Sequence, residues 1–351
     1  MQPCLTLRSE VLFPKADGLV SRASSARRLA SACLALCCAA ASATAQQAWV
    51  PIHSPVQRVI VVDNSEVPNA WWSPPSAPHR AGYNGIGHLS HGALERSLLV
   101  PGRAGLNFEH IFSGDSTSFE WPRWAPRLAP MTLTLSGANP QASLLQTSAG
   151  NWPLRTVITI ERRNAATIDF TITCTPWEDV WKKHGYIGLF FATYIDKPAD
   201  PSINFIGRSR PDQGSQEPRW IRHIPPAYGV EMSHRPAGSN WDPSYDPGFH
   251  IGPVTGFSSL EYLYPFYYGV TNGKAVIFMF ERSQDGELRF AHVPNGGGPG
   301  SAAWDFSFMQ RSYAIGQPFQ LRGALVVKDF IDDEDVILAY ESWSGETVIR
   351  P

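Results

Sequence analysis

The chain has 351 residues, with 29 basic and 31 acidic side chains, and it contains 18 Phe, 12 Trp and 11 Tyr. The net charge is −2 and there is no basic run, which argues against nucleic acid and against anionic lipid as partners. Many Trp and Tyr side chains suit a carbohydrate or glycan, because sugar C–H faces stack on aromatic rings, although the same rings also fill large β cores.

Residues 1–45 have the pattern of a signal peptide. Arg27 and Arg28 precede the apolar run Leu29–Ala41, and Ala43-Thr44-Ala45 supplies the small residues that signal peptidase requires before Gln46. The run is shorter than the roughly 20 residues of a membrane span. We therefore predict a secreted or periplasmic protein without a transmembrane anchor after leader removal. A buried N-terminal helix is the alternative, and a later start codon near Val20 stays open.

Removing 45 residues leaves 306, residues 46–351, which we expect to form a single β-sandwich domain. Five basic and two acidic residues lie in the leader, so this part carries a net charge of −5. It retains one cysteine, Cys174, which cannot form an internal disulfide, and the hydrophobic core must therefore hold the fold by itself.

Short runs rich in Val, Ile, Thr, Phe and Tyr recur along the chain and predict β-strands. Two runs alternate in polarity, Thr156–Glu161 and Thr167–Thr173, and the residues between them predict a hairpin turn. Asn272-Gly273 is a stronger hairpin signal, since both residues accept positive φ. The expected strands are Arg58–Asp63, Arg96–Val100, Met131–Leu135, Arg155–Glu161, Thr167–Cys174, Tyr186–Ile195, Ile203–Ile206, Pro265–Val270, Ala275–Glu281, Glu287–His292, Trp304–Met309 and Phe319–Val327.

One segment predicts a helix, Asp332–Trp343. Asp332 is a good N-cap, three acidic residues follow in the first turn, and Val336, Ala339, Tyr340 and Trp343 share one face. The strands do not alternate with helices, which excludes an α/β fold. We predict an all-β, mainly antiparallel fold, a large β-sandwich or super-sandwich with one C-terminal helix.

Three blocks resemble a family of exported bacterial proteins without an assigned activity. They are Tyr83-Asn84-Gly85 with Val100–Ile111, then His184–Ile195, and last Tyr262–Phe280 with Trp304-Asp305-Phe306 and the C-terminal helix. The resemblance supplies no catalytic residues. Its long strands, Trp/Tyr-rich loops and scattered His look like the galactose-mutarotase-like super-sandwich of sugar epimerases and polysaccharide-degrading enzymes, which is an analogy of fold and not of function.

The richest polar block is Asn107-Phe108-Glu109-His110. On a regular strand Asn107 and Glu109 face one side and His110 the other, so all three reach one ligand only if the strand bulges or ends there. Imidazole and carboxylate form the usual acid–base pair at neutral pH. The alternative is a buried hydrogen-bonded pair that fixes the end of the strand.

Other candidate residues stand at strand ends, where sites are usually built. Proton abstraction at a sugar carbon would use His184 and His234 with Glu109, and glycosidic cleavage by two carboxylates would add Asp305. The full catalytic set is Glu109, His110, His184, His234, His292 and Asp305, and the substrate-binding set is Asn107, Tyr186, Arg235, Tyr267 and Trp304. The Gly-rich run Asn295–Gly300 lacks the Lys-Ser/Thr of a phosphate loop and predicts a flexible loop beside a cleft.

These observations favour a carbohydrate-active protein, namely a glycoside hydrolase, a polysaccharide lyase or a sugar epimerase. A non-catalytic carbohydrate-binding protein or a structural protein of the cell envelope is the alternative. The sequence contains no Gly-x-Ser-x-Gly elbow, so a serine hydrolase of that type is not expected. It also contains no His-Glu-x-x-His motif, so a zinc protease is not expected. Cofactors, a divalent metal and the oligomeric state stay open.

Overall fold

The computed structural model of the protein describes residues 48–65, 82–116, 125–137, 140–211, 213–283 and 285–351. Residues 45–351 form one compact unit. The expected leader, residues 1–45, lies outside the described residues. Within the described part, no helix is long and apolar enough to cross a membrane.

The described chain is almost entirely β, as the composition and periodicity predicted. A small sheet joins β1 (Trp49–Pro51), β2 (Gln57–Val62) and β3 (Gly85–His91). The fifteen strands of the main sheet are β4 (Asn107–Phe112), β5 (Thr132–Ser136), β6 (Gln141–Gln146), β7 (Leu154–Arg162), β8 (Thr167–Pro176), β9 (Ile187–Ala192), β10 (Ile203–Ser209), β11 (Arg219–His223), β12 (Ser233–Pro236), β13 (Phe257–Tyr262), β14 (Phe266–Thr271), β15 (Lys274–Phe280), β16 (Gly286–Gly298), β17 (Ser301–Gln310) and β18 (Phe319–Asp329). Three helices complete the described elements, α1 (Ala125–Leu128), α2 (Gly252–Thr255) and α3 (Asp333–Ser344).

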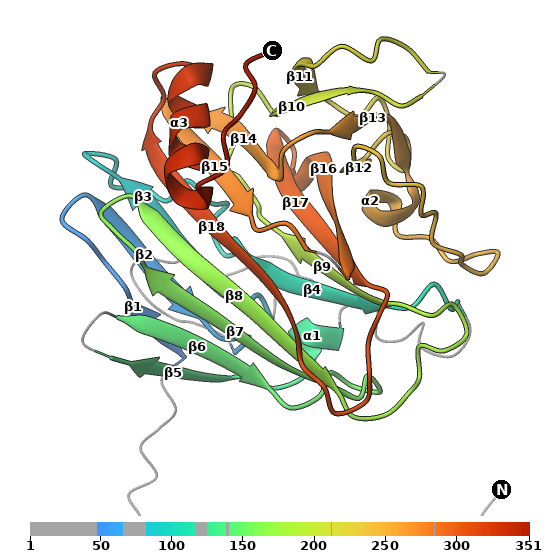
Figure 1. Cartoon of the computed structure of the whole chain (residues 1–351). Helices are drawn as coiled ribbons and strands as arrows, with labels where there is room; N and C mark the ends of the chain where they lie inside the picture. Colours follow the sequence, from blue (N-terminus) through green and yellow to red (C-terminus); the bar gives the residue numbers. More distant parts are fainter. Residues whose placement is uncertain (1–47, 66–81, 117–124, 138–139, 212, 284) are drawn as a thin grey trace, which may run out of the picture. The chain divides into compact units, whose positions relative to one another are not determined.

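The main sheet folds back on itself to make two facing layers. Its order is β4-β9-β17-β16-β12-β13-β10-β14-β15-β18-β8-β7-β6-β5, with β11 paired to β10 and a single parallel pair, β12 with β13 (Figure 1). Phe306 of β17 stacks on Phe170 of β8 at 6.1 Å between ring centroids, and it meets Phe280 of β15 edge-on at 4.9 Å. Strands so far apart in the order touch only if the two arms of the sheet face each other. The predicted sandwich is confirmed.

Burial differs between the two arms. Strands β7 and β8 alternate between buried and partly exposed residues, as Thr156–Glu161 and Thr167–Thr173 predicted. Strands β9 and β17 are buried along their whole length on both faces. One face of β9 and β17 belongs to the inter-layer core, and the other is covered by residues such as Val254 and Tyr83 from outside the sheet. Polar groups on this second face are therefore enclosed.

Two local predictions are confirmed. The β14–β15 hairpin turns through Asn272 and Gly273, with φ of 51° and 71°, the pair of positive angles that a two-residue turn of this type requires. The helix α3 begins after Asp332, whose side chain accepts a hydrogen bond from the backbone N–H of Asp335 at 2.8 Å. It ends at Gly345, which adopts the left-handed conformation.

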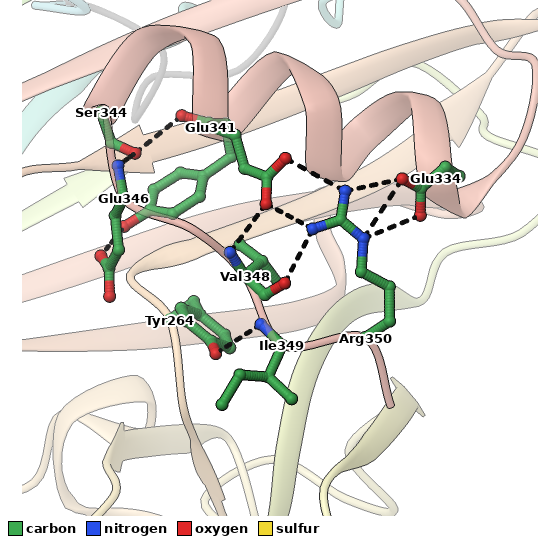
Figure 2. Close-up of polar contacts among 9 residues, drawn as sticks. Tyr264, Glu334, Glu341, Ser344, Glu346, Val348, Ile349 and Arg350 are labelled. Atoms are coloured by element: carbon green, nitrogen blue, oxygen red, sulfur yellow. Dashed lines mark hydrogen bonds and ion pairs between the residues drawn. The ribbon is translucent and has the colours of Figure 1, made fainter.

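The chain after α3 returns along the helix. Figure 2 shows Arg350 between two carboxylates of α3, Glu334 and Glu341, while the backbone N–H of Val348 donates to Glu341 at 2.8 Å. The backbone N–H of Ile349 donates to the Tyr264 hydroxyl at 2.8 Å, which ties the segment to the residues between β13 and β14. Val336, Ile337 and Tyr340 of α3 are buried against β14 and β15. The helix therefore covers the outer face of the sheet at that point.

Two predicted elements differ from the structure. Residues 96–100 are not a strand: Leu99 forms only an isolated bridge with Ile195, and the Ser97 hydroxyl accepts from the backbone N–H of Leu89 and of Leu99 at 3.1 Å. The Gly-rich run is not a loop through its length, because β16 continues to Gly298 before it turns into β17. The register of that hairpin shifts between Val293 and Gly298, where the glycines widen it.

Candidate active site

A bulge in β4 brings the polar block to one place. Asn107 and Phe108 pair with Ala192 and Phe191 of β9, but His110 pairs with the next residue, Phe190, so Glu109 is the extra residue. The bulge turns Glu109 and His110 toward the same side, which a regular strand forbids. Asn84 supports it: its side chain accepts from the backbone N–H of Phe108 at 2.9 Å and donates to the carbonyl of the same residue at 3.0 Å.

Glu109 and His110 line a cavity of about 200 Å³ on the second face of the sheet. Strands β4, β9 and β17 form its floor, Tyr228 and three residues between His250 and Pro253 form one wall, and Val293 and Gly296 of β16 form another. The lining residues are Glu109, His110, Phe190, Ala192, Tyr194, Tyr228, His250, Ile251, Pro253, Val293, Gly296, Ala303 and Asp305.

Glu109 is held as a carboxylate. Asn107 donates from Nδ2 to Oε2 at 2.9 Å, the Tyr194 hydroxyl donates to the same oxygen, and His110 Nε2 lies 3.5 Å from Oε1. Burial by itself would raise the pKa of Glu109. The contact with His110, the charge of Arg127 and the Tyr194 hydrogen bond outweigh burial and lower that pKa to about 2. Glu109 is therefore ionised at neutral pH.

Asp305 of β17 is in the opposite state. It is 1% exposed, and its Oδ1 accepts from the backbone N–H of Thr193 at 3.0 Å. Burial raises the pKa of Asp305 well above its usual value; the Thr193 hydrogen bond works against this and the negative charge of Glu109 adds to it. The surroundings of Asp305 therefore favour its protonated form. The cavity holds one carboxyl group with a lowered pKa and one with a raised pKa, the arrangement that allows one group to take a proton while the other gives one.

Arginine and tyrosine side chains pack around the cavity and stabilise its walls. They were not predicted from the sequence. The Arg103 guanidinium lies 4.9 Å from the centre of the Tyr194 ring and donates to the carbonyl of Gly296 at 2.7 Å, which fixes the end of β16. Tyr83 meets Tyr194 edge-on at 5.4 Å, and Arg127 covers the Tyr83 ring at 3.8 Å. Period-two alternation gives a signal for Tyr194, since it lies two residues beyond Ala192 and four beyond Phe190.

The rim of the cavity carries an exposed aromatic ring. Tyr228 is 64% exposed and lies 6.0 Å from the His250 ring. Gly252 lets the ring lie against the backbone, because a Cβ there would stand 2.7 Å from the Tyr228 ring atoms. Neither Tyr228 nor His250 was expected from the sequence, since both belong to a long irregular segment with no periodic pattern.

His234 and His292 belong to a different buried cluster and do not line the cavity. His234 Nε2 lies 3.2 Å from Nδ1 of His223, and its ring packs on Phe205 at 4.8 Å. Burial, followed by the charge of neighbouring histidines, holds the pKa of His234 well below its usual value, and burial lowers the pKa of His292 to about 3. These histidines are therefore neutral at physiological pH.

His184, Tyr186 and Arg235 lie in other contacts. His184 stands between Ser244 and Asp246, at 2.9 and 3.2 Å. Tyr186 is buried beside Trp241, 5.6 Å between rings. Arg235 pairs with Asp242 at 2.9 Å. These contacts join residues 241–246 to β12 and to the residues just before β9.

Trp304 and Tyr267 lie in the inter-layer core. Alternation along β17 points Trp304 away from Asp305, and its Nε1 donates to the carbonyl of Pro201 at 2.9 Å. The Tyr267 hydroxyl donates to the backbone carbonyl of Asp305 at 3.0 Å from the core side. Of the residues singled out in the sequence, the structure brings together Glu109, His110 and Asp305, with Asn107 behind Glu109. No three His, Cys, Asp or Glu side chains in the described part of the chain are grouped as a metal site requires.

No protein-family model and no curated protein matches this sequence, so the resemblance to an exported bacterial family stays a prediction. Solved structures that overlap with the chain include an alpha-N-acetylgalactosaminidase quadruple mutant from Bifidobacterium bifidum, with 12% identity and a TM-score of 0.35 over 61% of this chain and 29% of that one. A heparan sulfate lyase mutant from Pedobacter heparinus overlaps with 11% identity and a TM-score of 0.34, over 79% of this chain and 34% of that one. A protein named as a mutarotase from Salmonella typhimurium overlaps with 7% identity and a TM-score of 0.36, over 80% of this chain and 90% of that one. The chain spans about a third of the length of the first two. Overlap at these values transfers no activity to this chain.

Proposed function

We propose that the cavity between β4, β9 and β17 is the active site of a carbohydrate-active enzyme that works by acid–base catalysis. One observation carries the proposal: Glu109 and Asp305 line the same cavity with pKa values pushed in opposite directions. Two carboxyl groups that only stabilised the fold would not need opposite pKa shifts on one concave surface.

The lining favours a sugar ring as the ligand. Its volume of about 200 Å³ is below the roughly 300–1,000 Å³ of sites for drug-sized ligands, so it suits one small ring. The rim offers the exposed ring of Tyr228 for stacking, and the floor offers carboxyl and imidazole groups for hydroxyls. Arg103 is already bonded to the carbonyl of Gly296, which makes a neutral ligand a better fit than a polyanion.

In this proposal Glu109 is the general base and Asp305 the general acid. Glu109 removes a proton from the bound sugar or from a water molecule, and Asp305 gives its proton to the oxygen on which charge develops. Asn107 and Tyr194 fix the orientation of the Glu109 carboxylate, and His110 stands beside its other oxygen. Hydrolysis, elimination and epimerisation all need such a pair, and the products distinguish them.

A non-catalytic carbohydrate-binding role is the second candidate. The observation that favours it is the number of groups around Glu109, since Asn107, Tyr194 and His110 all contact the carboxylate. A carboxylate held by three neighbours can serve as a fixed hydrogen-bond acceptor for a sugar hydroxyl without moving a proton.

The test is incubation of the purified protein with a panel of mono- and oligosaccharides, followed by mass spectrometry for cleavage and NMR for epimers. We expect turnover in the wild type and a decrease of about 10²–10⁴-fold in Glu109→Gln and in Asp305→Asn. Glu217→Gln changes an exposed carboxylate outside the cavity and should keep full activity. If the protein binds a sugar but forms no product, and if Asp305→Asn binds that sugar with the same affinity, the enzyme proposal is overturned. The non-catalytic binding role then takes its place.

We further propose that residues 1–45 are an export signal and that the site works outside the cytoplasm. The supporting features are the two arginines before the apolar run and the Ala-x-Ala sequence before Gln46. N-terminal sequencing of the protein from a periplasmic or culture fraction should begin at Gln46. Recovery of the intact N-terminus only from the cytoplasm would contradict this.

A further inference from the structure

Outside the cavity, three side chains form a nucleophile–base–carboxylate series. Nδ1 of His184 lies 2.9 Å from Oγ of Ser244, and Nε2 of the same ring lies 3.2 Å from Oδ1 of Asp246. His184 precedes β9, whereas Ser244 and Asp246 belong to the segment between β12 and α2. Two separate parts of the chain thus meet at a single imidazole.

The carboxylate of Asp246 is fixed in place and charged. Its Oδ2 accepts from the backbone N–H of Ser116 at 3.1 Å and pairs with Lys183, which leaves Oδ1 for His184. The hydrogen bond from Lys183 lowers the pKa of Asp246. An ionised carboxylate only accepts hydrogen bonds, so Nε2 of His184 carries a proton in this contact, and a ring with a single proton then has none on Nδ1.

This tautomer makes Nδ1 of His184 an acceptor directed at the Ser244 hydroxyl. Ser244 is exposed, whereas the side chain of His184 is only 10% exposed. The Ser244 hydroxyl therefore faces solvent and contacts a general base, His184. The base in turn contacts a carboxylate, Asp246. Compared with serine proteases the two ring nitrogens exchange roles, but the chemical roles of the three groups are the same.

We propose that Ser244, His184 and Asp246 are a second catalytic site, which transfers a short acyl group from an ester. The inference does not depend on the function of Glu109 and Asp305. His184 Nδ1 takes the hydroxyl proton as Ser244 Oγ bonds to the ester carbonyl carbon. The carbon–oxygen bond to the alcohol then breaks, the alcohol leaves with the proton from His184, and water releases the acid by the same steps in reverse. Asp246 positions the imidazole and stays ionised.

The neighbouring surface suits a small apolar acyl group. A crevice of about 30 Å³ is lined on one side by apolar side chains such as Phe112, Phe249 and Ile251, and its polar lining includes Asp115 and Ser116. The backbone N–H of Ser116 holds Asp246. Phe249 itself donates its backbone N–H to the carbonyl of Asp246 at 3.0 Å, so the apolar lining and the series share one piece of backbone. Such a volume admits an acetyl group and not a long chain, which points to acetyl esters as substrates.

A mere latch between His184 and the segment of Ser244 would show the same distances, and reactivity separates the two roles. The probe is a fluorophosphonate, which loses fluoride when a serine activated by a neighbouring base bonds to its phosphorus. Peptide mass spectrometry of the folded, full-length protein should find the added phosphonyl group on Ser244. The label should disappear in His184→Gln although the serine is still present.

Turnover is measured with 4-nitrophenyl acetate and with the octanoate ester. We expect hydrolysis of the acetate to fall by about 10²–10⁴-fold in Ser244→Ala and in His184→Gln, and the octanoate to react poorly with the wild type. Ser312→Ala, a change of an exposed serine before β18, should retain full labelling and turnover. Thermal melting confirms that each variant is folded. If His184→Gln does not fold, Asp246→Asn takes its place as the variant that weakens the base. No label on Ser244 in the folded wild type, or equal labelling in a folded His184→Gln or Asp246→Asn, would overturn the second site.

Discussion

At the scale of single residues, environment gives two chemically similar groups different states. Glu109 is surrounded by donors and by the positive charge of Arg127, which offset the effect of its burial on the pKa. Asp305 has one backbone donor, Thr193, and the negative charge of Glu109 nearby. Both side chains are buried, so the identity of the neighbours, and not the degree of burial, decides the direction in which the pKa of each carboxyl moves.

Asp305→Asn should stabilise the fold at neutral pH while it removes the proposed acid. The raised pKa means that the folded state holds a proton that the unfolded state releases above about pH 3.8, so the stability that Asp305 contributes falls as the pH rises beyond that value. Asparagine keeps the acceptor for Thr193 and has no charge to neutralise. We expect a higher melting temperature than the wild type at pH 7.

The difference in melting temperature should shrink toward zero well below pH 3.8, where aspartate is protonated in both states. Glu217→Gln, at an exposed position, should show no such pH-dependent gain. A lower melting temperature of Asp305→Asn at pH 7 would mean that Asp305 is ionised in the fold.

At the scale of elements, single deviations from regular strand geometry place the functional groups. The β4 bulge turns Glu109 to the side of His110, and the widened end of β16 brings the Gly296 carbonyl to Arg103. A regular β4 would have left Glu109 and His110 on opposite faces. The β14–β15 hairpin is the contrasting case, in which two residues with positive φ keep a ladder in register from Phe266 to Met279.

Gly273→Ala should destabilise the protein by about 1–2 kcal/mol, the cost of the left-handed conformation for an L-residue. An added Cβ would meet no atom within 4 Å, so the cost is conformational and not steric. Urea unfolding followed by fluorescence measures it. Gly273→Asn should recover part of the loss, because asparagine tolerates positive φ better. Equal stability of Gly273→Ala and the wild type would exclude this turn geometry.

At the scale of the whole molecule, the core between the two arms of the sheet holds the fold together. Phe306, Phe170 and Phe280 join strands that are far apart in the sheet order, without a disulfide in the described chain. The same burial encloses His223, His234 and His292 in neutral form. The global stability therefore depends on pH through groups that take no part in the proposed chemistry.

The protein should lose stability as the pH falls below about 6.5. The unfolded chain protonates its histidines near that value, but the pKa of folded His292 is about 3 and those of His223 and His234 are also lowered. The unfolded state then binds more protons, at up to about 1.4 kcal/mol per pH unit for each histidine. The stability that these residues contribute is complete above pH 6.5 and is lost down to about pH 3 for His292.

His292→Leu should reduce this acid sensitivity, since an apolar side chain has no proton to gain. Chemical denaturation at pH 7, 6 and 5 measures the slope for the variant and for the wild type. His250→Leu replaces an exposed histidine and should leave the slope unchanged. An identical slope in His292→Leu would show that His292 does not titrate differently in the folded and unfolded states.

The sequence by itself determined the fold class, most strand positions, the Asn272-Gly273 hairpin and the capped helix α3. Each of these depends on neighbours in the chain, on period-two alternation, on residues that accept positive φ or on a capping side chain. Alternation also separates Asp305 from Trp304, so the core position of Trp304 was within reach of the sequence. The strand expected at 96–100, in contrast, does not form, and the Ser97 hydroxyl accepts from backbone N–H groups at this place.

Only the tertiary structure decided which polar residues meet. The bulge at Glu109 depends on the pairing of β4 with β9, residues about 80 positions apart in the sequence. Asp305 comes to the same cavity through β17, and His234 and His292 go to a separate buried cluster through β12 and β16. Pairing between distant strands and the burial that it imposes set these contacts and the protonation states that follow, and neither has a local pattern in the sequence from which it can be derived.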